Sequence, residues 1–215
     1  MPDWTDLERS AMSKVNFKPG NMLYPVPVVM VSCAKENGMP NIITVAWTGT
    51  ICSSPAMLSI AVRKERYSHA IISETKEFVV NLVTKDLTFA ADYCGVKSGR
   101  YTDKFKEMHL TPLKSQKISA PGIAESPVNI ECRVTEVKEL GSHDLFIAEV
   151  LNVTADDRYM DDKNSLHLNA AGLVAYSHGE YFELGKKIGK FGYSVKKKPN
   201  TKKKADSKKK YGKRH

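Results

Sequence analysis

The stretch NIITVAWTGTICSSPAMLSIAVRKERYSHAI, residues 41 to 71, carries more polar side chains than two buried strands need. Arg63, Arg66 and Ser68 come together just before a predicted helix. The amides at a helix N-terminus attract anions, and arginine binds phosphate oxygens. Backbone amides of a Ser/Thr-rich turn over 48–54 can also bind the polar edge of a heterocycle. The stretch therefore indicates a site for a ligand with a phosphate and a flat ring.

The same residues have a plainer explanation. Hydroxyl groups can cap turns, and the cations can decorate a solvent-exposed strand end, where they contribute little to stability. Residue spacing alone does not decide between the two explanations.

The elements that position these residues are mostly strands. Apolar alternation and β-branched residues predict six strands, at 26–34, 42–48, 57–63, 77–83, 128–139 and 144–155. The turn KENGMP joins the first two strands and LGSH joins the last two, so we expect antiparallel hairpins. Local pairing of this kind favours a barrel or a sandwich over a doubly wound parallel sheet.

Helices are predicted at 67–75, 85–94 and 102–108, with Thr102 as the cap of the third. Residues 163–185 have a mixed pattern that assigns no element. The sequence contains no internal repeat, P-loop, strand-linked GxGxxG, HExxH, GxSxG or EF-hand motif. The enzyme and binding classes that depend on those motifs therefore find no support.

The net charge of +9 comes from one end of the chain. Residues 196–215 hold ten Lys, one Arg and one Asp and contribute +10, whereas the other 195 residues hold 22 basic and 23 acidic side chains and sum to −1. Such a lysine run buries too little apolar surface to fold, so we expect a disordered tail. The body of the protein has no general bias toward anions.

The cysteines and the N-terminus point to a soluble cytoplasmic protein. Cys33, Cys52, Cys94 and Cys132 are scattered without metal-ligand spacing, so no metal site is expected and each is interpreted as a packing residue of a reducing compartment. The acidic, polar start lacks a signal peptide, and no apolar run has the ~20 residues of a membrane helix.

The chain resembles the flavoredoxin and flavin reductase-like family of FMN-binding split barrels in segments that follow one another in order: NIITVAWTGTICSSP, RKERYSHAII, EFVVNL, KSGRYTDKF, APGIAESPVNIEC, GSHDLFIAEV and HGEYFELGKKIGKFGYS. The resemblance implies an FMN-binding domain over 20–195, between an N-terminal extension, 1–19, and the tail, 196–215. The implied fold is mainly β with helices, an antiparallel six-stranded Greek-key split β-barrel.

The resemblance also implies a function. We expect a homodimer that binds FMN near its interface and passes electrons from NAD(P)H, or from a reduced redox protein, to a flavin, ferric or other acceptor. His143 is the implied catalytic residue. The implied FMN contacts are Asn41, Thr44, Trp47, Thr48, Thr50, Ser53, Ser54, Arg63, Ser68, Asn81, Lys104 and Tyr176.

The chemistry of these side chains suits the implied roles. Trp47 can shield a flavin ring, and the amides of Asn41 and Asn81 can donate and accept along its pyrimidine edge. Lys104 can place a cation near the ring or a phosphate, which favours an anionic reduced flavin. Without the resemblance, the simpler interpretations are that Trp47 is a core residue, that Asn41 and Asn81 cap turns or strand ends, and that Lys104 is an exposed helix residue.

His143 has the type of side chain that changes charge near neutral pH, with a reference pKa of about 6.5, and can contact a nicotinamide or an acceptor. His69, in the predicted phosphate helix, is a secondary candidate. Flavin reductases of two-component monooxygenases often have a glycine-aspartate-histidine turn. The turn here reads Gly141-Ser142-His143, which favours the flavoredoxin-like branch with bound FMN.

A binding protein is the rival hypothesis. In this alternative the chain is a non-catalytic FMN-binding electron carrier, or a module that docks on polyanions through the basic tail. Tyr211 is the one aromatic residue among those basic residues, so base stacking has little support. We expect the tail to make at most a weak, accessory polyanion contact.

Overall fold

The computed structural model describes residues 14–196. The chain divides into two compact units, Met1–Leu184 and Gly185–His215. The described part of the second unit contains one short 3-10 helix, η5 (Tyr193–Val195). The predicted tail lies, except for Lys196, outside the described residues.

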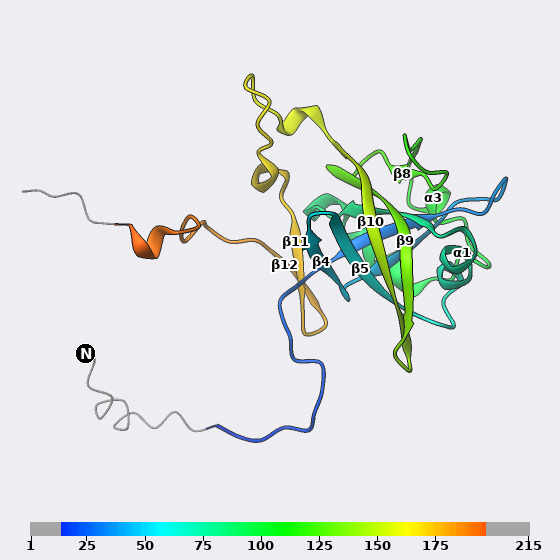
Figure 1. The fold of residues 1–215 in the computed structure, drawn as a ribbon, viewed down its shortest axis with the longest axis horizontal. Coiled ribbons are helices and arrows are strands. Elements are labelled where there is room, and N and C mark those ends of the chain that lie inside the picture. Colours follow the sequence, from blue (N-terminus) through cyan, green and yellow to red (C-terminus); the bar gives the residue numbers. More distant parts are fainter. Residues whose placement is uncertain (1–13, 197–215) are drawn as a thin grey trace, which may run out of the picture. The chain divides into compact units, whose positions relative to one another are not determined.

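A curled antiparallel sheet dominates the first unit, as predicted (Figure 1). Its seven strands follow the order β3-β2-β6-β9-β10-β5-β4, and every pairing is antiparallel. The strands are β2 (Val29–Cys33), β3 (Asn41–Val45), β4 (Thr48–Ser53), β5 (Ala56–Arg63), β6 (Glu77–Leu82), β9 (Val128–Glu139) and β10 (His143–Ala155). The expected hairpins β2–β3 and β9–β10 are both present.

Smaller elements cover the sheet. A three-stranded sheet contains β1 (Val26–Pro27), β11 (Val174–Ser177) and β12 (Glu180–Glu183), and a two-stranded one contains β7 (Pro112–Leu113) and β8 (Gly122–Ile123). The α-helices are α1 (Tyr67–Thr75), α2 (Thr88–Val96) and α3 (Lys104–Glu107), and the unit has 3-10 turns η2 (Lys85–Leu87), η3 (Asp157–Tyr159) and η4 (Leu168–Ala171). No helix of the described residues is long and apolar enough to cross a membrane.

The prediction of six strands was wrong by one in the main sheet. Most of the expected Ser/Thr-rich turn over 48–54 is the edge strand β4, whose β-branched residues pair with β5. Thr50 and Ser53 are exposed, whereas the Thr48 hydroxyl donates to the Ser59 carbonyl of β5 at 2.8 Å. The predicted strand 26–34 divides into β1 and β2, because Pro27 has no amide hydrogen to continue one ladder. Residues 163–185, left unassigned, form η4, β11 and β12.

The helix predictions were closer. Helix α1 has the predicted bounds, whereas the region 85–94 begins as η2 before α2. The third helix is one turn long, and its cap is Asp103 rather than Thr102: the Asp103 carboxylate accepts a hydrogen bond from the Lys106 amide at 3.1 Å. A carboxylate caps as well as a hydroxyl does, so the helix begins one residue later than a cap at Thr102 would give.

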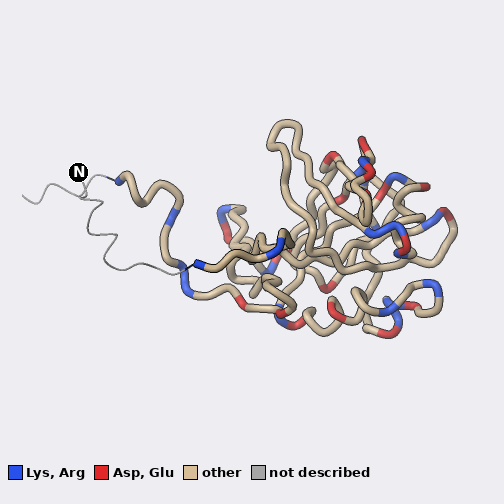
Figure 2. Tube along the Cα trace, turned by 90° about the horizontal axis from the view of Figure 1, so that it is seen from below, with Lys and Arg blue, Asp and Glu red and all other residues tan. Residues whose placement is uncertain are grey.

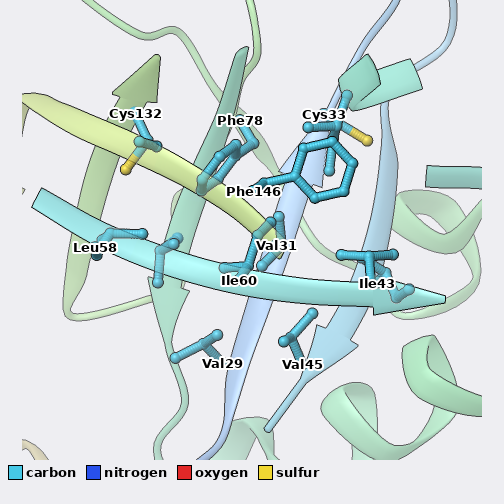
Figure 3. Close-up of a cluster of buried hydrophobic side chains, with 14 of the residues drawn as sticks. Val29, Val31, Cys33, Ile43, Val45, Leu58, Ile60, Phe78, Cys132 and Phe146 are labelled. Carbon is cyan, nitrogen blue, oxygen red and sulfur yellow. The ribbon is translucent and has the colours of Figure 1, made fainter. Parts of the chain in front are cut away.

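Two apolar clusters lie on the two faces of the sheet. The first fills the curl, where Phe78, Phe146 and Ile60 are fully buried (Figure 3), and it includes Ile71 and Ile72 of α1. The second packs the opposite face against α2 and α3. Strand β2 belongs to both clusters, which explains why all five of its residues are buried.

Charges of both signs are interspersed along the described chain (Figure 2). The four cysteines are unpaired; Cys33, Cys94 and Cys132 are buried and Cys52 is partly exposed. Burial raises the pKa of the Cys33 and Cys132 thiols to about 12. Three of the four therefore behave as small packing residues, as predicted.

A buried amide network fastens the centre of the sheet. Asn81 of β6 is completely buried and donates hydrogen bonds to the Met30 carbonyl at 2.8 Å and to the Ser32 hydroxyl at 2.9 Å. Its carbonyl oxygen accepts from the Ile123 amide at 2.9 Å and from the Asn129 side chain at 2.8 Å. One side chain therefore joins β2, β6, β8 and β9, and its bonding capacity is used within the protein.

Replacing Asn81 by alanine tests this structural role. We expect Asn81→Ala to lower the free energy of unfolding by about 2 to 4 kcal/mol, because buried donors of Ile123 and Asn129 lose their acceptor. Thr135→Ala is the control, since its exposed hydroxyl makes one hydrogen bond to the Ile147 carbonyl, and surface changes shift stability by about 0.5 kcal/mol or less. Urea denaturation of both variants measures the difference; equal midpoints would contradict the assignment.

Candidate functional site

Two adjoining cavities open between the sheet, α1 and α2. The larger has a volume of about 390 Å³ and is lined by β3, β5, α2, the start of β10 and the β11–β12 hairpin. The smaller, of about 260 Å³, lies at the start of α1 and is lined by β3, α2, α3 and the 97–99 loop. Ile43 and Arg66 line both cavities, so one elongated ligand can occupy the two.

The smaller cavity has the chemistry of an anion site. Lys104 is 3% exposed, and its ammonium donates to the carbonyls of Ile42 at 2.6 Å and Cys94 at 2.8 Å. No carboxylate of the described residues forms an ion pair with it. An ammonium has three donors, so one is left for a ligand. Burial lowers the pKa of Lys104, and the positive charge of Arg66 acts in the same direction.

The first turn of α1 forms the opposite wall. The Asn41 side-chain amide donates to the Ser68 hydroxyl at 2.7 Å, and both residues are buried. Arg66 is the N-cap residue, and no side chain caps the helix. The helix therefore presents the positive end of its dipole to the cavity without a side-chain oxygen in the way. Lys97 adds a further cation to the lining, and Glu65 is the one carboxylate.

A glycine makes the close approach in this cavity possible. A Cβ atom on Gly99 would lie 1.9 Å from the side-chain oxygen Oδ1 of Asn41, far inside any real contact. Only glycine can bring the 97–99 loop against Asn41 without displacing the amide from Ser68.

The larger cavity has apolar and aromatic walls. Trp47 follows β3, and Val45, Ala61 and Val62 continue the apolar lining. Tyr176 of β11 packs edge-on against Tyr181, with ring centroids 5.6 Å apart. Such walls suit a flat ring.

Polar groups stand at particular places around this cavity. His143, the first residue of β10, pairs across the ladder with Arg63, the last residue of β5, and both line the cavity. The Ser142 hydroxyl oxygen and His143 Nδ1 lie 2.9 Å apart. Thr44 also lines the cavity, but its hydroxyl donates to the Ala91 carbonyl, so it fixes α2 to β3 instead of pointing a donor at a ligand.

Tyr181 and Asp92 complete the rim, and neither was predicted. The Tyr181 hydroxyl donates to the Asp92 carboxylate at 3.1 Å, and burial together with this carboxylate raises the pKa of Tyr181 to about 12. Both residues line the larger cavity. The segment HGEYFELG contained Tyr181, but no pattern linked it with Asp92, because the pair forms only when β12 reaches α2.

The structure brings together eight of the thirteen predicted site residues. The larger cavity contains Thr44, Trp47, Arg63, His143 and Tyr176, and the smaller contains Asn41, Ser68 and Lys104. The other five line neither cavity. Thr48 lines a third hollow of about 440 Å³, together with Trp47. Thr50 and Ser53 are exposed on β4, and Ser54 is exposed in the turn that follows it. Asn81 belongs to the network in the sheet.

Comparison with known proteins identifies the family. Residues 21–185 match the family model described as "Flavin reductase like domain". The chain belongs to this family. Its fold is accordingly a split barrel, as the resemblance implied, with one strand more than expected in the main sheet.

Individual relatives agree. An uncharacterised protein of Archaeoglobus fulgidus is 35% identical over 145 residues, which cover 67% of this chain and 81% of the relative. The solved flavoredoxin of Desulfovibrio vulgaris (Miyazaki F) superposes with a TM-score of 0.80 at 28% identity, covering 86% of this chain and all of that one. The reductase component of a Rhodococcus opacus 4-nitrophenol 4-monooxygenase/4-nitrocatechol 2-monooxygenase is 25% identical over 127 residues, 59% of this chain and 65% of that protein.

The lowered pKa of Lys104 leads to a testable prediction about how the binding of FMN, used as a phosphate-bearing probe, depends on pH. A bound phosphate favours the charged amine, so affinity falls as pH rises through a Lys104 pKa that lies below the ordinary 10.5. Lys104→Arg stays charged over that range, because arginine does not deprotonate near it. As the pH is increased, we expect the dissociation constant of the wild-type protein for FMN to begin to rise at a lower pH than the dissociation constant of Lys104→Arg. Parallel curves in fluorescence titrations would contradict the prediction.

Proposed function

We propose that this protein binds FMN across the two cavities and passes electrons from NAD(P)H, or from a reduced redox protein, to a flavin, ferric or other acceptor. The observation that carries the proposal is the buried Lys104 ammonium, which lacks a carboxylate among the described residues and lies beside the Asn41–Ser68 pair. A buried cation with a free donor calls for an anion.

The residues present fit FMN. The phosphate would lie in the smaller cavity, against Ser68, Arg66 and Lys104, at the start of α1. The ring would lie in the larger cavity against Trp47 and Tyr176. Arg66 lines both cavities and would stand beside the chain that joins phosphate and ring.

Bound FMN supplies the hydride and single-electron chemistry. The protein binds the phosphate, orients the ring and excludes water from one of its faces with aromatic and aliphatic side chains. Arg63 and Arg66 place positive charge along the cavity, which favours negative charge on a ligand there. His143 stands at the start of β10, where its Nε2 can hold or accept a proton while Nδ1 faces Ser142.

A non-catalytic electron carrier is the second candidate. The similarity to a flavoredoxin and the Gly141-Ser142-His143 turn favour it. In this case FMN is reduced by another protein, and His143 meets that protein instead of a nicotinamide. The lysine-rich tail would then add a weak polyanion contact, as it would for the enzyme.

We also propose that the protein works as a cytoplasmic homodimer with FMN near the interface. Apolar side chains of the N-terminal segment support this assembly: Phe17, Met22 and Leu23 are 78%, 62% and 86% exposed. Asn21, from the same segment, lines the larger cavity. A second copy that covers this segment would bury apolar surface beside the cofactor.

An anaerobic absorbance titration separates the enzyme from the carrier. Protein reconstituted with FMN is titrated with NADH and with NADPH, and the bleaching of the flavin band is followed. We expect rapid bleaching with one of the nucleotides. Bleaching only with dithionite or a reduced redox protein would establish the carrier, and a protein that takes up no flavin would contradict both candidates.

The glycine at the phosphate end provides a second test. Gly99→Ala displaces Asn41 from Ser68, so we expect it to weaken FMN binding about tenfold or more, which corresponds to about 1.4 kcal/mol. Riboflavin, which has no phosphate, should bind both proteins alike.

Gly49→Ala is the matched control, because a Cβ atom there meets nothing within 4 Å. Fluorescence quenching of the two flavins measures all four affinities. If Gly99→Ala bound FMN as tightly as the control, the phosphate would not lie beside Asn41.

A further inference from the structure

A hydrogen-bonded pair, the buried Asp144 and the partly buried His69, lies next to residues of the two cavities and has no part in the function proposed above. Asp144, Phe146 and Ala148 form the inward-facing row of β10, and Asp144 is the charged member of this otherwise apolar row. It is 5% exposed. A carboxylate in such a place is costly unless a partner compensates it.

The partner comes from α1. His69 Nε2 lies 2.8 Å from Asp144 Oδ2, and the imidazole packs edge-on against Phe146 with ring centroids 5.3 Å apart. Lys64 Nζ approaches Asp144 Oδ1 to 3.4 Å, but it is bonded to Glu139 at 2.7 Å. Asp144 Oδ1 has no hydrogen-bond partner among the described residues. Burial raises the pKa of Asp144, but the hydrogen bond from His69 and the nearby positive charge of Lys64 outweigh it and lower the pKa.

The sequence neighbours of the pair are the residues of the candidate site. His69 follows Ser68, which lines the smaller cavity, and Asp144 follows His143, which lines the larger one. The two partners are 75 residues apart in sequence. The hydrogen bond therefore joins the first turn of α1 directly to the first residues of β10. It connects a wall of the smaller cavity with a wall of the larger one.

The rest of α1 is fastened differently. Ile71 and Ile72 are buried in the apolar core, which resists separation of the helix from the sheet but has no directional preference. At the far end, Glu74 pairs with Lys35 at 2.5 Å on an exposed surface, where an ion pair contributes little. The His69–Asp144 hydrogen bond is directional and largely shielded from solvent, with side chains 16% and 7% exposed, and so it can set how the first turn is placed.

We propose that His69 and Asp144 are positioning residues that hold Ser68 and Arg66 at a fixed place relative to His143, so that one flavin can reach both cavities at once. The inference rests on the proposed FMN site. Its specific consequence concerns the phosphate. Without the pair, the ring can still bind in the larger cavity, but the phosphate loses its preorganised partners.

The test removes the pair without leaving a buried charge. His69→Phe alone leaves Asp144 unpaired and can prevent folding, whereas His69→Phe combined with Asp144→Leu replaces both partners by apolar groups of similar size, a change that proteins often tolerate. Glu74→Gln, which removes the exposed ion pair at the other end of α1, is the control. Circular dichroism and thermal melting establish that each variant is folded.

The readout is the dissociation constant for riboflavin divided by that for FMN. A loss of packing alone would weaken both flavins together and leave this ratio unchanged. We expect the ratio to fall about tenfold in the double variant and to stay at the wild-type value in Glu74→Gln. A folded double variant with the wild-type ratio would overturn the positioning role and leave the FMN site standing, whereas a wild-type protein that binds neither flavin would overturn both.

Discussion

The buried ammonium of Lys104 is the interaction on which the candidate site depends. Two backbone carbonyls, of Ile42 in β3 and Cys94 in α2, hold it in place. Each carbonyl carries only a partial negative charge, so the positive charge stays uncompensated within the described protein. Such a charge raises the free energy of the empty protein, and an anion that binds beside it compensates the charge and lowers that free energy. The cavity is therefore prepared for an anion before one arrives.

The curl of the sheet decides what else surrounds that anion. Strand β3 contributes Asn41 to the smaller cavity and Val45 to the larger one, with Ile43 common to both. Helix α1 closes the curl at the point where β5 ends, so the polar first turn of the helix faces the cavities while Ile71 and Ile72 enter the core. One amphipathic helix thus connects the stability of the fold with the geometry of the site.

Much of this arrangement could be predicted from the sequence, for identifiable reasons. The bounds of α1 and the hairpins β2–β3 and β9–β10 follow local apolar patterns, which act over a few residues. Strand β4 was mistaken for a turn because an edge strand with one solvated face carries the same Ser and Thr residues as a loop. The flavin role of Asn81 was implied by the resemblance and stays a prediction; the register of β2, β6 and β9, which no local pattern contains, shows the hydrogen bonds that its amide makes within the sheet. Tyr181 with Asp92, and Gly99 with Asn41, depend on contacts between distant segments, which no local pattern contains.

A crystal structure of the protein with FMN tests the central claim most directly. We expect a phosphate within hydrogen-bonding distance of Ser68 and of the Lys104 ammonium, and a flavin ring against Trp47. FMN bound elsewhere, or bound with its phosphate in solvent and the cavity beside Lys104 filled only by water, would contradict it.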